Sequence, residues 1–121
     1  MHEFLSSNRT NVFETLRNAS LMRQSFWDPD KKISLEYRGL ELGGESGEAQ
    51  NKLKKLAREA MGLRGSRSSR AEVAEELADV IIVADLIAGM LNIDLWSEVV
   101  KKFNKTSQEN DLPVRITSGE V

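Results

Sequence analysis

Prolines occur only at positions 29 and 113 of this 121-residue chain, so the long stretch between them contains no proline that would break a helix. That stretch also lacks the sustained alternation of polar and apolar residues that is typical of strands. Apolar residues recur instead every three or four positions, as they do along one face of a helix. The sequence predicts one all-α domain over 1–121, a four-helix bundle-like fold with a core over about 11–108 and an irregular tail over 109–121.

A cap and a turn are expected to delimit the first helix. Asn11 would cap it with Glu14 at its third position, and the turn at 28–30 would end it. Its inward residues are expected to be Val12, Phe13, Leu16 and Ala19. A second helix is expected over about 34–61, before a basic, glycine-rich loop that begins at position 62. Its buried stripe would comprise Ala49, Leu53, Leu56 and Ala60.

Ser69 and Glu72 match the capping box, in which two side chains satisfy each other's free backbone donors at a helix start. The third helix that begins there is apolar on most faces and is expected to be the most buried. Its main stripe is Val73, Leu77, Val80, Ala84, Ile87 and Leu91. Asn92 is expected to end this helix and Asp94 to cap a fourth one. On the fourth helix we expect Leu95, Val99 and Phe103 inward, with Lys101, Lys102 and Lys105 outward.

The composition excludes several classes of site. The 19 acidic residues nearly balance the 17 basic ones, so no global positive charge favours nucleic acid. Without cysteine there are no disulfides, zinc-thiolate sites or iron-sulfur clusters, and the only histidine is His2 at the terminus. The longest apolar run, 80–84, is too short for a bilayer, and no signal peptide is apparent. We therefore expect a cytoplasmic protein with neither a membrane nor a nucleic-acid partner, whose metal ligands would be carboxylates.

Two groups of acids are spaced to share helix faces. At about 100° per residue, Glu41, Glu45 and Glu48 fall on one face of the second helix, and Glu76 and Asp79 lie one turn apart on the third. If the two helices pack antiparallel, these acids face one another and form a site for a divalent cation such as Mg²⁺, with Mn²⁺ as a substitute. Taken alone, each pair would more often be a solvated helix face.

Three glycines lie within the same acidic segment, at positions 43, 44 and 47. A glycine in a helix interior costs roughly 1 kcal/mol relative to alanine. Their presence therefore predicts the close approach of another backbone segment or of a ligand.

The motif formed by Glu45 and Glu48, followed by that formed by Glu76 and Asp79, resembles the signature of the MazG-like all-α NTP pyrophosphohydrolases. That family includes dimeric dUTPases and dCTP pyrophosphatases. The resemblance covers roughly 11–110, and three stretches are similar to the sequence motifs of the family: 41–49, 75–82 and 102–107. It implies Mg²⁺-dependent cleavage of a nucleoside triphosphate between its α and β phosphates. It also implies a small bundle completed by formation of a homodimer or homotetramer.

Further side chains are candidates for catalysis or phosphate binding. The candidate catalytic residues are Glu41 and Glu45, with Glu41 acting as the general base or supporting the ligands; Glu41 could equally be a solvent-facing residue. Lys52 and Lys55 continue the acidic stripe and are candidate phosphate contacts, although Lys52 could merely pair with Glu48.

Other positions are weaker candidates. Asp85 lies within the apolar third helix, where a structural ion pair is favoured over contact with the substrate's sugar. Trp27 could stack on a base, whereas Trp96 is expected to pack. The resemblance adds a second set of substrate-binding candidates in the fourth helix: Lys102, Asn104 and Lys105.

A protein of another class would share many of these features. A non-catalytic helical interaction module could carry the same acids on a solvated face, and it would neither turn over nucleotides nor respond to Mg²⁺. A di-iron carboxylate bundle is disfavoured, because such sites use Glu-x-x-His pairs and the predicted helices contain no histidine.

Overall fold

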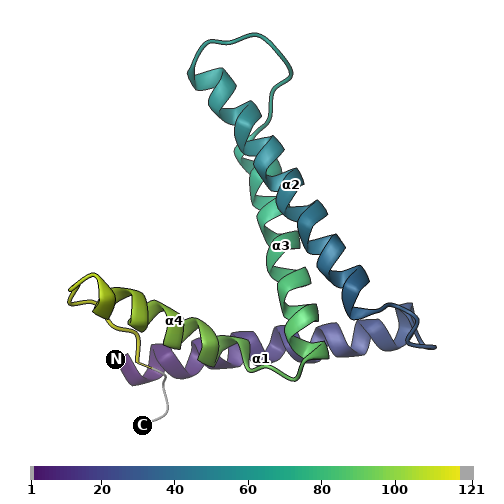
Figure 1. The fold of residues 1–121 in the computed structure, drawn as a ribbon, viewed down its shortest axis with the longest axis vertical. Coiled ribbons are helices and arrows are strands. Elements are labelled where there is room, and N and C mark those ends of the chain that lie inside the picture. The colour runs from purple at the N-terminus through teal and green to yellow at the C-terminus, as the bar shows by residue number, and fades with distance from the viewer. Residues whose placement is uncertain (1, 118–121) are drawn as a thin grey trace. The chain divides into compact units, whose positions relative to one another are not determined.

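The computed structural model describes residues 2–117, with side chains from Val12 onward, and in this range it contains four helices and no strand (Figure 1). The helices are α1 (His2–Trp27), α2 (Leu35–Ala60), α3 (Arg70–Met90) and α4 (Leu95–Glu109). The predicted all-α class is therefore confirmed. The chain divides into a hairpin unit, Asp28–Ile87, and a terminal unit that comprises Met1–Trp27 and Ala88–Val121.

The predicted start of the first helix is wrong. α1 already begins at His2 and runs through Asn11, so Asn11 lies inside the helix, although its side chain is outside the described range. Residues three apart are also neighbours within a helix, so the spacing of Asn11 and Glu14 does not by itself mark a start. The predicted end before Asp28 is confirmed.

In the hairpin unit, α2 and α3 run antiparallel and are joined by the loop over 61–69 (Figure 1). Ser34 caps α2, because its hydroxyl accepts the N–H of Tyr37 at 3.1 Å. The capping box that begins α3 is present as predicted: Ser69 Oγ accepts the N–H of Glu72 at 3.1 Å, and the Glu72 carboxylate accepts the N–H of Ser69. These caps fix where each helix enters the hairpin.

In the terminal unit, α3 ends as the sequence predicts. Asn92 adopts a left-handed conformation (φ 57°), and the N–H groups of Asn92 and Ile93 bond to the carbonyls of Gly89 and Ala88. This pair of bonds is the Schellman motif, which satisfies the last carbonyls of a helix. Asp94 then caps α4 by accepting the N–H of Ser97 at 3.2 Å.

Contacts of α1 with α4 and with the connection before α4 hold the terminal unit together. The rings of Phe13 and Trp96 lie 5.0 Å apart, and Arg17 donates to the carbonyl of Ile93 at 2.9 Å. Trp96 is therefore a packing residue, as predicted.

Burial follows the predicted helix faces only in part. Among the described residues α3 carries the most buried side chains, as expected, and the lysines of α4 face outward. Several residues expected to face inward are nevertheless exposed: Val12, Ala19, Leu53, Ala60, Leu77, Leu91, Val99 and Phe103. A helical period shows only which residues share a face, and what covers that face depends on the neighbouring helix. None of the described helices combines the length and apolarity that crossing a membrane requires.

Candidate metal centre

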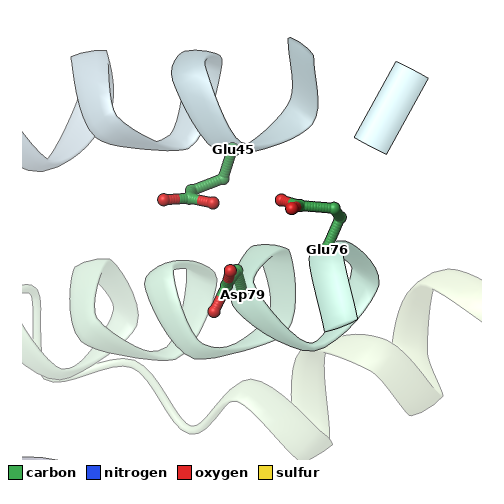
Figure 2. Close-up of side chains that lie close together, drawn as sticks. All are labelled: Glu45, Glu76 and Asp79. Carbon is green, nitrogen blue, oxygen red and sulfur yellow. The ribbon is translucent and has the colours of Figure 1, made fainter. Parts of the chain in front are cut away.

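Three carboxylates from the two helices of the hairpin meet in one place. Glu45 extends from α2 towards Glu76 and Asp79 on α3 (Figure 2). One oxygen atom from each residue lies within 4.8 Å of the corresponding atoms of the other two, and all three residues are half-buried. The antiparallel hairpin therefore brings together the two acidic motifs, which are far apart in the sequence.

Glu45 is electrostatically strained in this position. Partial burial raises the pKa of its carboxyl above the ordinary value, and the charges of Asp79, Glu48 and Glu41 raise it further. The Glu45 oxygen Oε2 is buried and has no hydrogen-bond partner among the described residues. Within the described part of the chain, this oxygen therefore lacks the compensating donor that a buried charge requires.

Glu48 and Glu76 form a second crowded pair across the helices. A hydrogen bond with the Glu48 side chain is the largest cause that raises the pKa of Glu76, followed by burial and by the charges of Glu48, Asp79 and Glu45. Glu48 is itself exposed, and its oxygens are not among those that meet within 4.8 Å. Glu48 thus lies at the rim of the cluster, while Glu45, Glu76 and Asp79 form its centre.

Glu41 has a partner that the sequence analysis did not identify. The buried side chain of Arg38 donates to Glu41 Oε1 at 2.5 Å, three residues earlier on the same helix. The i,i+3 spacing of an arginine and a glutamate was the available signal. The pair makes Glu41 an anchored carboxylate rather than a free solvent-facing one.

The two candidate lysines of α2 differ in their surroundings. Lys52 forms an ion pair with Glu72 of α3 at 3.2 Å, so the predicted alternative pairing with Glu48 is wrong. That contact is the largest cause that lowers the pKa of Glu72. Lys55 is half-buried and has no ion pair among the described residues. Of the two lysines, Lys55 is the one that can accept a phosphate without breaking an existing pair.

The glycines of α2 do not mark a close approach within the chain. A Cβ atom added at Gly43, Gly44 or Gly47 would meet nothing within 4 Å. The predicted approach of another backbone segment is therefore wrong for the described part of the chain, and the approach of a ligand stays a prediction.

The remaining candidates lie elsewhere in the chain. Asp85 is 1% exposed on α3 and takes part in a polar or electrostatic interaction, which favours its structural role. The amide of Asn104 makes two hydrogen bonds with the backbone of Ile116, at 2.8 and 3.0 Å, and so secures the chain after α4. The exposed candidates Trp27, Lys102 and Lys105 belong, like Asn104, to the terminal unit, and their roles at the acids of the hairpin unit stay predictions.

Comparison of the chain with protein-family models, with curated proteins and with solved structures finds no match.

Proposed function

We propose that the chain is a Mg²⁺-dependent nucleoside triphosphate pyrophosphohydrolase of the MazG-like type, which acts in nucleotide pool control or housecleaning. One observation carries the proposal: Glu45, Glu76 and Asp79 converge from two helices until their oxygens lie within 4.8 Å of one another. Like charges gathered in this way raise one another's pKa, and a divalent cation is the ligand that relieves their repulsion. We infer the type of reaction from the resemblance of the two motifs to the MazG signature.

The residues fit the proposed ion. Every donor is a carboxylate oxygen, the ligand type that Mg²⁺ and Mn²⁺ prefer. Glu45 and Glu76 each have one buried oxygen that lacks a hydrogen-bond partner among the described residues. The ion would be held by Glu45, Glu48, Glu76 and Asp79.

The chain's own groups have defined roles in the proposed hydrolysis. Bound Mg²⁺ would supply positive charge to the phosphate oxygens and acidify a nearby water. The water oxygen bonds to the α phosphorus as the bond from that phosphorus to the α–β bridging oxygen breaks, which releases the monophosphate and pyrophosphate. Glu41 or Glu45 accepts the proton from the water, and Lys55 binds the phosphates.

Exposed apolar side chains support a homodimer or homotetramer as the functional form. Leu40, Leu77 and Ile81 are exposed on the hairpin unit, whose two helices offer no further neighbour within that unit. Burial of such side chains against another copy would remove apolar surface from water. Light scattering at micromolar concentration should give at least a dimer, and a fully active monomer would contradict this assembly.

The function is tested by assaying pyrophosphate release from a panel of standard and modified nucleoside triphosphates with Mg²⁺. Wild type should hydrolyse at least one nucleotide, and both Glu76→Gln and Asp79→Ala should reduce its turnover to background without loss of helical content. Glu75→Gln is the matched control, because Glu75 is an exposed neighbour on the same helix.

Two results would contradict the proposal. Normal turnover in Glu76→Gln or Asp79→Ala would place the chemistry elsewhere. No turnover of any nucleotide, together with no effect of Mg²⁺ on thermal stability, would favour the helical interaction module with a solvated acidic face.

A further inference from the structure

Arg38 is the only arginine with a buried side chain among those whose side chains the structure describes, at 6% exposure. It lies in the second turn of α2, before the acidic stripe begins. A buried guanidinium destabilises a fold unless carboxylates or other acceptors compensate its charge. The neighbours of Arg38 therefore indicate what its burial achieves.

Two acids of the hairpin unit lie close to Arg38. Its Nη1 donates to Glu41 Oε1 at 2.5 Å, and its charge is among the influences that lower the pKa of Asp28, behind the backbone hydrogen bonds from Ile33 and Lys32. Asp28 accepts those bonds at 2.9 and 3.0 Å and thereby shapes the segment before α2. Arg38 thus has one acidic neighbour in this segment and another in the acidic stripe.

Glu41 is close enough to the acidic cluster of Glu45, Glu76 and Asp79 to affect its electrostatics. It lies one turn before Glu45, and its charge is one of those that raise the pKa of Glu45. A glutamate on a helix surface samples several rotamers, and each ordered side chain of this kind loses entropy on being fixed. A charge-assisted bond to a buried guanidinium fixes the carboxylate in one place and engages only one of its two oxygens.

We propose that Arg38 is a positioning residue, which holds the Glu41 carboxylate beside Glu45 so that its second oxygen can accept a proton or support a metal ligand. This inference rests on the proposed pyrophosphohydrolase function. It adds a requirement that the acidic motifs alone do not contain, namely a buried cation one turn before the first acid of the stripe. The pair with Glu41 serves the site, whereas proximity to Asp28 serves the fold.

The two roles are separated by a double-mutant cycle. The variants are Arg38→Gln, Glu41→Gln and their combination, with Asp28→Asn for the structural neighbour and Glu36→Gln as an exposed acid on the same helix. Each is assayed for kcat and KM with the best nucleotide found, for Mn²⁺ affinity by water-proton relaxation, and for Tm.

Loss of a residue that orients a site group typically lowers activity 10- to 100-fold. Arg38→Gln should therefore reduce kcat by roughly that factor with a smaller change in KM, and it should reduce the kcat of Glu41→Gln by less than about twofold. Arg38→Lys should recover part of the loss. Asp28→Asn should lower Tm without this loss of kcat, and Glu36→Gln should change neither.

Unchanged kcat in folded Arg38→Gln, or losses that multiply in full in the double variant, would overturn the positioning role. If Arg38→Gln does not fold, Glu41→Asp carries the test, because it keeps the charge but moves the carboxylate by one methylene group; unchanged kcat would then refute the role. If wild type hydrolyses no nucleotide, the proposed function fails, and the measured Mn²⁺ affinity then tests the positioning role of Arg38. A loss of Mn²⁺ affinity of about tenfold in Arg38→Gln that does not add to the loss in Glu41→Gln would still support the positioning role. No loss of Mn²⁺ affinity, or losses that add in full in the double variant, would overturn it.

Discussion

Replacing Glu76 by glutamine should have opposite effects on the metal-free protein and on its response to Mg²⁺. In the metal-free state a hydrogen bond with the Glu48 side chain, partial burial and the charges of Glu48, Asp79 and Glu45 all raise the pKa of Glu76, so its ionised form is disfavoured. Glutamine removes the charge of Glu76 at nearly constant volume. The metal-free variant should therefore be more stable than wild type at neutral pH, while its stabilisation by Mg²⁺ should be largely lost.

The size of the wild-type response follows from linkage. At a Mg²⁺ concentration ten times the dissociation constant, the native state gains about 1.4 kcal/mol. A chain of 121 residues has an unfolding entropy of about 0.25 kcal/mol/K, so Tm should rise by about 6 °C. Na⁺ at matched ionic strength should reproduce little of this increase in Tm, because the increase comes from Mg²⁺ binding at a site, whereas Na⁺ only screens the charges.

The pH dependence has a defined sign. In the metal-free native state Glu45 and Glu76 bind protons more tightly than in the unfolded chain, where the ordinary glutamate pKa is 4.5. Stability from this source is therefore present at low pH and is lost as the pH rises from about that value through the raised native pKa values. Because protons and Mg²⁺ compete for the same oxygens, the stabilisation by Mg²⁺ should grow over that interval.

The assay is a thermal melt of wild type, Glu76→Gln and the control Glu75→Gln across MgCl₂ concentrations at neutral and mildly acidic pH. The control carries the same change of net charge at an exposed site on α3. Equal Mg²⁺ responses in wild type and Glu76→Gln would refute the reasoning, since the ion would then bind away from this cluster.

Three pairs of substitutions test further local features. Gly44→Ala and Gly43→Ala should each raise the free energy of unfolding by about 0.5–1 kcal/mol in thermal melts, because the added Cβ atom meets open space. Activity should fall only in Gly44→Ala, because Gly44 flanks the acidic face. Equal activities of the two variants would argue against the approach of a ligand at Gly44. Asn92→Ala should cost about 1 kcal/mol in denaturant titrations because of its positive φ, and Asn92→Gly should cost nothing; equal losses would contradict the cap. Lys55→Gln should raise KM severalfold in nucleotide titrations, whereas the same change at exposed Lys54 should not; equal KM values would remove the phosphate contact.

Local chemistry made most helix boundaries predictable. Ser69 with Glu72, Asn92 and Asp94 each act through atoms within a few residues of one another, and each is found where the sequence placed it. The start of α1 was missed because an i,i+3 pair of polar residues also occurs inside helices.

The sequence by itself determined the all-α class and the two acidic motifs, since helical period and residue spacing are properties of the chain alone. Only the tertiary structure decided which side chains meet. Packing of α2 against α3 joined Lys52 to Glu72 rather than to Glu48, and it left Leu53 and Leu77 exposed although their spacing is that of a buried stripe. A helical period shows which residues share a face, whereas the position and orientation of the neighbouring helix decide what covers that face and which charges it brings within a few ångströms.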